Sequence, residues 1–309
     1  MSKIALLFAG QGAQYVGMGK DFAEQIPDAK QWFDRANEIL GFDLANICFN
    51  GPEAELTKTE NCQPGIFVVS WVAFQLLKQR APNLQFQATA GLSLGELTAL
   101  AAADVFSFEN GVRISRQRGR FMQEACDVTK GGMAAVLNLD QTVLAEVCKE
   151  ADVEMANLNC PGQIVISGEA DKIAKACELA KAKGAKRALP LPVAGAYHSR
   201  LMASARPKVQ EMLAAVQMSA PNVPVISNVT AQPHGAPSEV AGRLVDQVTS
   251  SVRWEDSMRY LLAQGFTRFI ELGPGAALTG FMKRIDKNAQ SFNVTDMASL
   301  DATVKAVTS

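Results

Sequence analysis

The sequence has few histidines, almost no net charge and no long apolar run. Two of its 309 residues are histidine, and 30 Lys and Arg nearly balance 31 Asp and Glu, for a formal net charge of -1. Because this balance creates no overall positive field, we expect neither a nucleic acid nor a membrane as a partner. No stretch approaches the roughly 20 apolar residues that a transmembrane helix needs. Small molecules or another protein remain as the expected partners.

Cysteine is present, but in no arrangement that suggests disulfides or a metal site. The six cysteines are scattered and form no C-x-x-C pair, which indicates reduced, mostly packed thiols. The apolar run at the N-terminus ends at Gly10 and Gln11, which makes it too short for a signal peptide. We expect a cytoplasmic location, no metal and a monomeric chain.

The order of the predicted elements indicates an α/β protein of two parts. Strand and helix patterns alternate in residues 1–128 and 198–309, which predicts a mostly parallel sheet covered on both faces. Residues 129–197 show the order strand, helix, strand, strand, helix, strand, which is the ferredoxin-like split pattern. We interpret them as a small domain inserted into a discontinuous larger one. In the larger part, Pro64 is expected in the first turn of a buried helix.

A serine flanked by glycines lies between a predicted strand and a predicted helix. Residues 91–95, "GLSLG", match the G-x-S-x-G nucleophile elbow, in which a tight turn pushes the Ser93 side chain off the end of the sheet. The following helix directs backbone N–H groups and a partial positive charge to the same place. The motif alone is weak, and an ordinary turn with a helix-capping serine explains it about equally well.

A serine hydroxyl needs a base, and the sequence offers two histidines. His234 lies in "QPHGAP", a Pro- and Gly-rich segment that we expect to be a solvated loop. His198 lies in "VAGAYHSRLM", where the inserted domain returns to the larger one, and is the candidate base; a capping or surface histidine is the alternative. No Asp or Glu stands out at a strand end between Ser93 and His198, so a main-chain carbonyl could orient the imidazole.

Two further groups complete the candidate site. Acyl transfer needs two N–H donors for the oxyanion, and the backbones of Leu94 and of Gln11 in "FAGQGAQ" are the candidates. The alternative for this glycine turn is a phosphate loop, but it lacks the Lys and Ser or Thr of a P-loop. Arg118 shares a helix face with Met122, and Gly119 beside it allows a close approach. The anion that pairs with Arg118 could be a local glutamate or a substrate, and the residues alone favour the local partner.

Together these motifs resemble the malonyl-CoA:acyl carrier protein transacylase family along the whole chain. The similar segments, in order, are "FAGQGAQYVGMG", "GLSLGELTAL", "RGRFMQEA", "NLNCPGQIVISG", "YHS" and "ELGPGAALTG". Each motif is modest by itself, whereas all of them in this order are specific. The resemblance implies an α/β fold, with an α/β-hydrolase-like large domain and an inserted small ferredoxin-like α+β domain.

The resemblance also implies roles for single residues. Ser93 would be the nucleophile and His198 the base. The backbone N–H groups of Gln11 and Leu94 would form the oxyanion hole. Arg118 would bind the free carboxylate of the malonyl group, which reverses the preference for a local partner.

Further site residues follow from the same resemblance. Met122 and Asn159 would line the acyl pocket, and the main-chain carbonyl of Arg253, in "VRW", would orient His198. Tyr197, before the histidine, resembles the aromatic residue of malonyl-selective relatives. The chain departs from the family pattern at three positions, with Leu92 for a histidine, Leu97 for an aromatic residue and Ala9 for a proline. These departures leave the polarity of the pocket and the acyl preference open.

The implied reaction is a ping-pong transfer. A malonyl group would move from malonyl-CoA to the serine and then to the phosphopantetheine thiol of acyl carrier protein, supplying extender units for fatty acid synthesis. No permanently bound cofactor is expected, because malonyl-CoA is a substrate and the phosphopantetheine belongs to the partner protein. The alternatives are a free-standing acyltransferase serving a polyketide synthase, a serine thioesterase, and a non-catalytic relative that keeps the fold.

Overall fold

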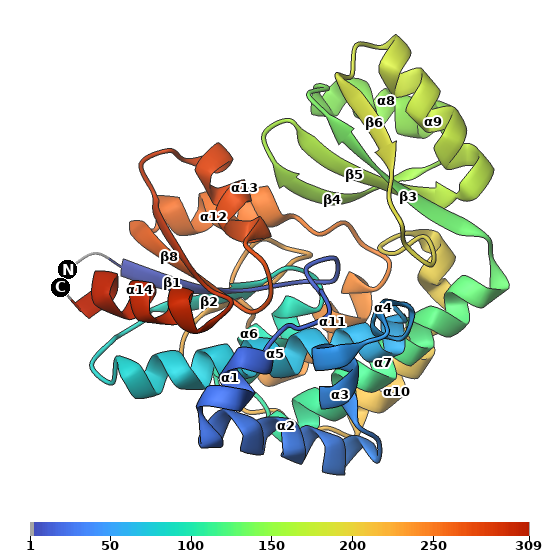
Figure 1. Cartoon of the computed structure of the whole chain (residues 1–309). Coiled ribbons are helices and arrows are strands. Elements are labelled where there is room, and N and C mark those ends of the chain that lie inside the picture. Colours follow the sequence, from blue (N-terminus) through green and yellow to red (C-terminus); the bar gives the residue numbers. More distant parts are fainter. Residues whose placement is uncertain (1–2, 309) are drawn as a thin grey trace.

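A five-stranded parallel sheet forms the centre of the larger part of the protein (Figure 1). The computed structural model describes residues 3–308. In spatial order, the strands are β7 (Val225–Ile226), β2 (Ala88–Gly91), β1 (Lys3–Phe8), β8 (Phe266–Leu272) and β9 (Gln290–Val294). Every neighbouring pair is parallel, as the alternation of strand and helix patterns predicts.

Helices cover both faces of this sheet. Those of the larger part are α1 (Lys20–Gln25), α2 (Pro27–Leu40), α3 (Leu44–Asn50), α4 (Glu53–Leu56), α5 (Thr59–Arg80), α6 (Gly95–Ala102), α7 (Phe108–Val128), the 3-10 helix η1 (Arg200–Ala205), α10 (Arg206–Ala214), α11 (Pro237–Gln247), α12 (Trp254–Ala263), α13 (Ala277–Ile285) and α14 (Met297–Thr308). Leu6 and Phe8 of β1 pack in the apolar cluster that contains α5, α6 and α7. Ala5 and Leu7 point to the opposite face and pack with α12 and α13. Burial on both faces explains the unbroken apolar run of β1.

Helix α5 is buried around almost its whole circumference, as its apolar composition predicts. The prediction that Pro64 lies in the first helical turn is wrong, because α5 begins at Thr59 and the proline lies inside it. Proline lacks the N–H that would bond to the carbonyl of Glu60, four residues earlier. Arg116 of α7 donates to that carbonyl at 2.7 Å. A side chain of the neighbouring helix thus satisfies the acceptor that the proline leaves free.

The close contact between α5 and α7 depends on a glycine. A Cβ on Gly119 would lie 2.6 Å from the carbonyl oxygen of Thr59 and 3.0 Å from Cα of Glu60. The first turn of α5 is therefore the element that approaches Gly119. On the same stretch of α7, Arg118 and Met122 are buried, at 3% and 1% exposure.

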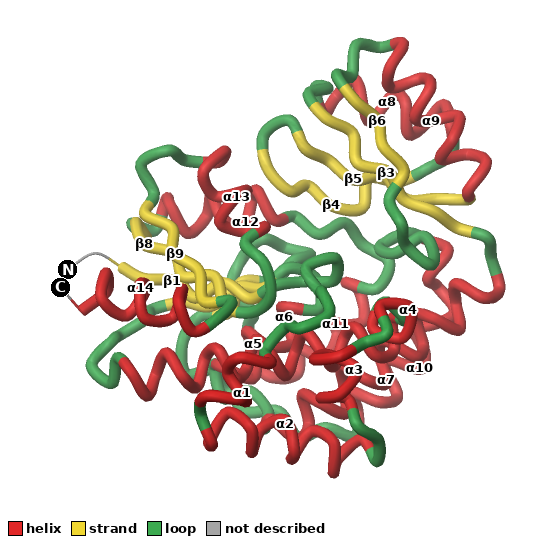
Figure 2. The backbone as a smooth tube through the Cα atoms, in the orientation of Figure 1, coloured by secondary structure: helices red, strands yellow, loops and turns green. Residues whose placement is uncertain are grey.

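A second, antiparallel sheet stands apart from the first (Figure 2). In spatial order its strands are β4 (Glu154–Cys160), β5 (Gln163–Glu169), β3 (Gly131–Leu137) and β6 (Arg187–Pro190). Helices α8 (Gln141–Ala151) and α9 (Ala170–Ala182) cover one face of it. This is the ferredoxin-like arrangement, and the fold class of an α/β-hydrolase-like part with a ferredoxin-like insertion is confirmed. The limits of the insertion, 129–197, stay a prediction.

Backbone hydrogen bonds join the small sheet to the larger part. The N–H of Leu158 in β4 donates to the carbonyl of Val252 at 2.9 Å, and the N–H of Val252 donates to the carbonyl of Ala156 at 2.8 Å. On β3, Val136 packs under the two covering helices, whereas Met133 lines a cavity that also contains residues of the larger part. The small sheet thus presents its other face to the carboxyl end of the parallel sheet.

We predict that Gly119→Ala lowers the free energy of unfolding by about 1–3 kcal/mol, because the added methyl group would collide with the backbone of α5. Gly242→Ala is the matched control, since Gly242 lies in a helix and its added Cβ would meet nothing within 4 Å. This control should leave stability unchanged or raise it by up to about 1 kcal/mol, because alanine favours helix. Urea denaturation measures the difference, and two equally stable variants would contradict the close approach.

Candidate active site

The turn around Ser93 has the geometry of a nucleophile elbow. Ser93 lies between β2 and α6, and its φ of 52° is in the left-handed region that residues with a side chain rarely adopt. A Cβ on Gly91 would lie 1.9 Å from the carbonyl carbon of Gly95, and one on Gly95 would lie 2.2 Å from the carbonyl oxygen of Phe8. The N-cap of α6 is Leu94, without a side-chain hydrogen bond, so Ser93 does not cap the helix. Close packing requires both glycines of the motif.

Ser93 and His198 meet at the carboxyl end of the parallel sheet. The Oγ of Ser93 lies 2.7 Å from Nε2 of His198. His198 follows β6, precedes η1, is 4% exposed and has a φ of 58°. Two residues held in uncommon backbone conformations at one place are typical of functional sites. The structure therefore brings together the two side chains that the sequence pairs as nucleophile and base.

The other ring nitrogen of His198 faces a main-chain carbonyl, but not that of Arg253. Nδ1 lies 2.8 Å from the carbonyl oxygen of Gln247. The expectation for Arg253 is wrong, because its carbonyl accepts the N–H and the hydroxyl of Ser257 in the first turn of α12, at 3.0 and 2.8 Å. Gln247 instead ends α11, where carbonyls have no partner within the helix. The partial negative charge of this helix end also favours a protonated imidazole during a reaction.

The surroundings of His198 keep its imidazole neutral. Burial and then the nearby Arg118 cation lower the pKa of His198 to about 4, against the opposing effect of the carbonyls of Gln247 and Ser250. With Nδ1–H donated to Gln247, Nε2 carries the lone pair that faces the Ser93 hydroxyl. His198 is therefore in the form of a base at neutral pH.

Arg118 lies beside the Ser–His pair and contacts no carboxylate within residues 3–308. Its three hydrogen bonds go to Gln63 Oε1 at 2.8 Å, Gln247 Oε1 at 2.8 Å and Ser93 Oγ at 3.2 Å. Burial lowers the pKa of Arg118 to about 10, so the guanidinium stays charged at neutral pH. The local glutamate that the residues alone favour as its partner does not touch it. A buried cation thus lies next to the nucleophile with neutral acceptors around it.

A cavity of about 510 Å³ opens between the Ser–His pair and the small sheet. Six of the predicted site residues line it, namely Gln11, Ser93, Met122, Asn159, Tyr197 and His198. Leu92, which stands where a histidine is usual, lines it as well. In the part of the chain that the structure describes, no acceptor takes the backbone N–H of Gln11 or Leu94. Both N–H groups are therefore without a protein acceptor within residues 3–308, and Gln11 also lines the cavity.

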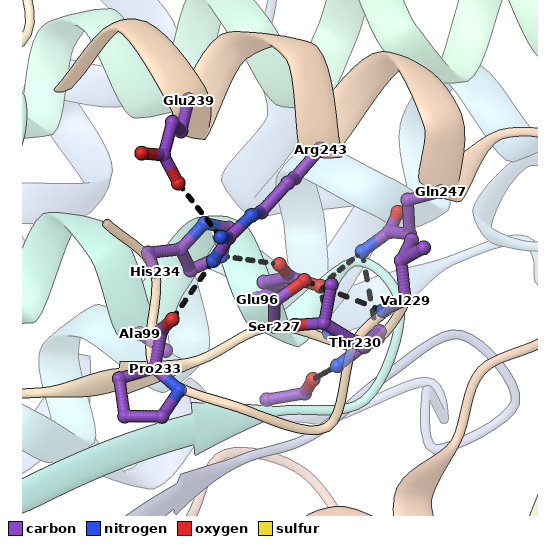
Figure 3. Close-up of polar contacts among 12 residues, drawn as sticks. Glu96, Ala99, Ser227, Val229, Thr230, Pro233, His234, Glu239, Arg243 and Gln247 are labelled. Atoms are coloured by element: carbon purple, nitrogen blue, oxygen red, sulfur yellow. Dashed lines mark hydrogen bonds and ion pairs between the residues drawn. The ribbon is translucent and has the colours of Figure 1, made fainter. Parts of the chain in front are cut away.

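His234 is not the solvated histidine that its Pro- and Gly-rich segment predicts (Figure 3). Its side chain is fully buried, and Nε2 lies 2.6 Å from Oε1 of Glu96 in α6. The backbone N–H of His234 donates to the carbonyl of Val225 in β7 at 2.8 Å. The segment folds back along the edge strand of the parallel sheet, and its imidazole is buried against Glu96, which lies 138 residues away in sequence.

Several polar residues that the sequence analysis missed hold the site together, namely Gln63, Glu96, Asn228 and Gln247. Asn228 accepts the N–H of Ser93 at 2.6 Å and donates to the carbonyl of Gly91 at 2.8 Å, which fixes the elbow from the far side. The sequence did hold one indication of Glu96, because a charged residue is unusual in the otherwise apolar start of α6. The three amide side chains carry none, because amides are common in ordinary loops and helices.

Residues 5–302 match the family model of the acyl transferase domain. The chain belongs to that family. This acyltransferase is 43% identical to a malonyl CoA-acyl carrier protein transacylase of Bacillus subtilis strain 168, over 99% of the chain and 98% of the relative. It is 41% identical to a polyketide biosynthesis malonyl CoA-acyl carrier protein transacylase of the same strain, over 93% of the chain and 99% of the relative. The crystal structure of an acyl-carrier-protein-S-malonyltransferase from Bartonella henselae has a TM-score of 0.95 and 38% identity, over 99% of this chain and 100% of that one.

Three further observations concern the acyltransferase as a whole. Its six cysteines are buried free thiols, as their spacing predicts. Across residues 3–308, no group of three or more His, Cys, Asp or Glu side chains could hold a metal ion. No helix in the same range is both long enough and apolar enough to cross a membrane.

We predict that the His198 ring stays neutral until the pH falls to about 4, because burial and Arg118 disfavour the imidazolium. An NMR titration can follow it, since the chain has two histidines and the spectrum of His198→Ala assigns the signal. The folded-state pKa lies below the ordinary value of about 6.5, so this group makes the folded state lose stability as the pH falls from about 6.5 to about 4. A midpoint near 6.5 would show that the ring is not buried beside a cation.

Proposed function

We propose that this acyltransferase moves a malonyl group from malonyl-CoA to the phosphopantetheine thiol of an acyl carrier protein, through a malonyl ester of Ser93. The observation that carries the proposal is a serine paired with a base and placed 3.2 Å from a buried guanidinium that contacts only neutral acceptors. A malonyl group on Ser93 would bring a free carboxylate to that guanidinium. The relatives named malonyl CoA-acyl carrier protein transacylase support the same donor and acceptor.

In the first half-reaction, the Ser93 oxygen attacks the thioester carbon of malonyl-CoA while Nε2 of His198 takes the hydroxyl proton. The carbonyl of Gln247 holds the imidazole in place and stabilises the imidazolium. Negative charge develops on the former carbonyl oxygen, for which the backbone N–H groups of Gln11 and Leu94 are the proposed donors. When the intermediate collapses, the C–S bond breaks and coenzyme A leaves with the proton from His198.

In the second half-reaction, the phosphopantetheine thiol takes the place of coenzyme A. His198 accepts the thiol proton, and the sulfur attacks the ester carbon of malonyl-Ser93. The C–O bond to Ser93 then breaks, and the proton returns to the serine oxygen. The cavity beside the pair would hold the acyl group in both halves, with Met122 and Asn159 in its wall. A base that begins each half-reaction neutral suits this sequence of proton transfers.

Fatty acid synthesis is the proposed destination of the malonyl group. A carrier protein of a polyketide assembly line is the second candidate, because a polyketide biosynthesis relative is 41% identical over 93% of the chain. The two candidates share their chemistry and differ in the carrier protein that docks. Transfer rates to purified carrier proteins of the two kinds distinguish them. The cytoplasmic location and the monomeric state stay predictions.

We predict that Ser93→Ala forms no acyl-enzyme, because the variant loses the hydroxyl that lies 2.7 Å from Nε2 of the His198 base. Intact-mass measurement after incubation with malonyl-CoA should find one malonyl group on the unaltered protein and none on the variant. A malonyl group on Ser93→Ala would contradict the assignment of the nucleophile. Release of free malonate faster than transfer to a carrier protein would favour a thioesterase.

We predict that Arg118→Ala lowers the rate of malonyl loading on the order of 10- to 100-fold, the effect of losing a hydrogen bond to a charged group. Acetyl loading should change much less, since an acetyl group has no carboxylate to bind. Arg120→Ala is the matched control, because Arg120 lies on the same helix with its side chain 56% exposed. Loading rates with both acyl-CoAs decide the matter. Equal losses of malonyl and acetyl loading in Arg118→Ala would exclude a carboxylate-binding role.

A further inference from the structure

The buried carboxylate of Glu96 is connected to Arg118 through a single side chain, that of Gln247. Glu96 of α6 is 0% exposed and has no part in the proposed proton transfers. The Gln247 amide bridges the two charges, because its Oε1 accepts from Arg118 at 2.8 Å and its Nε2 donates to Glu96 Oε2 at 2.6 Å. Figure 3 shows the Gln247 side chain reaching from α11 towards Glu96, with His234 on the other side of the carboxylate.

The hydrogen bonds around Glu96 indicate that it is ionised. Its carboxylate faces Nε2 of Gln247, the backbone N–H of Asn228 at 3.1 Å and Nε2 of His234 at 2.6 Å. The other ring nitrogen of His234 is buried and has no hydrogen-bond partner among the residues that the structure describes. A proton there would leave a buried donor unpaired, which is rarer than an unpaired acceptor. The imidazole is therefore neutral with its proton on Nε2, and Glu96 keeps its negative charge.

The two charges fix the orientation of the Gln247 amide. A guanidinium only donates hydrogen bonds and a carboxylate only accepts them. A flipped amide would set N–H groups against Arg118 and its oxygen against Glu96, which is unfavourable on both sides. The chain from Arg118 through Gln247 to Glu96 therefore consists of two charge-assisted hydrogen bonds that connect a cation to an anion.

We propose that Glu96 is a specificity-determining residue, the resident counter-charge of Arg118, which limits the preference for malonyl over neutral acyl groups. The inference rests on the proposed function, in which Arg118 binds the malonyl carboxylate. Before a substrate binds, Glu96 balances a cation that would otherwise be buried without an anion. When an acyl carboxylate arrives, a second negative charge joins the same cation. Repulsion between the two carboxylates weakens the binding of malonyl and leaves acetyl unaffected.

Glu96→Gln tests this, because it removes the charge and keeps the shape. The new amide oxygen can still accept from Gln247 and Asn228, and the new NH2 group faces Nε2 of His234, which must then carry its proton on Nδ1. We expect the ratio of kcat/KM for malonyl to that for acetyl loading to rise on the order of ten- to thirtyfold, the effect of one charge roughly 8 Å away at an effective dielectric constant of about 20. Intact-mass kinetics of Ser93 loading with both acyl-CoAs provide the ratio. Damage to the site would lower both rates without raising the ratio, so an unchanged or lower ratio in folded protein overturns the inference.

A control variant and a substitute variant test the same inference. Glu239→Gln removes an exposed carboxylate at the outer end of the same network, where Glu239 pairs with Arg243 at 2.7 Å (Figure 3). The ratio of malonyl to acetyl loading should stay unchanged in this variant. A rise equal to that of Glu96→Gln would show that any lost negative charge has this effect, which overturns the inference.

If Glu96→Gln does not fold, His234→Lys keeps the carboxylate and sets an ammonium against it. That variant should also raise the ratio, and an unchanged ratio overturns the inference.

Arg118→Ala separates this inference from the function on which it rests. If Arg118→Ala loses malonyl and acetyl loading equally, the carboxylate-binding role fails, and the role of Glu96 fails with it. If Arg118→Ala lowers malonyl loading more than acetyl loading and Glu96→Gln leaves the ratio unchanged, the proposed function stands. Only the role of Glu96 as a counter-charge is then wrong.

Discussion

The hydrogen bond from His198 Nδ1 to the carbonyl of Gln247 is the contact on which the geometry of the site depends. The acceptor is part of the main chain, so the position of α11 sets the orientation of the base and no third ionisable side chain is needed. The side chain of the same residue accepts from Arg118 and donates to the carbonyl of Ser93, at 2.8 and 3.0 Å. One residue at a helix end thus positions the base, the cation and the backbone of the nucleophile.

Strain at the site is balanced by contacts from several elements. Ser93 and His198 both have left-handed backbone conformations, each of which costs on the order of 1–3 kcal/mol. Asn228 takes the N–H of Ser93, Gln247 binds its carbonyl, and the glycines beside it pack against neighbouring backbone. Because these contacts come from β2, α11 and the segment after β7, the elbow forms only when the parallel sheet and its helices are assembled.

The parts of the structure that the sequence predicted are those set by local patterns. Alternating strand and helix patterns were enough for the parallel sheet, and the order of six elements was enough for the ferredoxin-like sheet. β9 (Gln290–Val294) was not foreseen, because its residues are mostly half-buried and polar residues interrupt its apolar pattern. The choice of Gln247 over Arg253 depends on which carbonyl tertiary packing brings to the imidazole, and any residue type can supply a carbonyl. The burial of His234 likewise depends on Glu96 of α6, which lies 138 residues away in sequence.

The bond between Arg116 and the carbonyl of Glu60 has a consequence for the divergence of this fold. Pro64 removes the amide that would serve this carbonyl, so the side chain of one helix compensates for an imino acid in another. If Arg116 were replaced first, the carbonyl of Glu60 would lose its hydrogen-bond donor. If Pro64 were replaced first, the new backbone N–H could bond to this carbonyl, and the bond from Arg116 would no longer be needed. Positions 64 and 116 are thus coupled through one carbonyl, and the effect of replacing Arg116 depends on whether residue 64 supplies an amide.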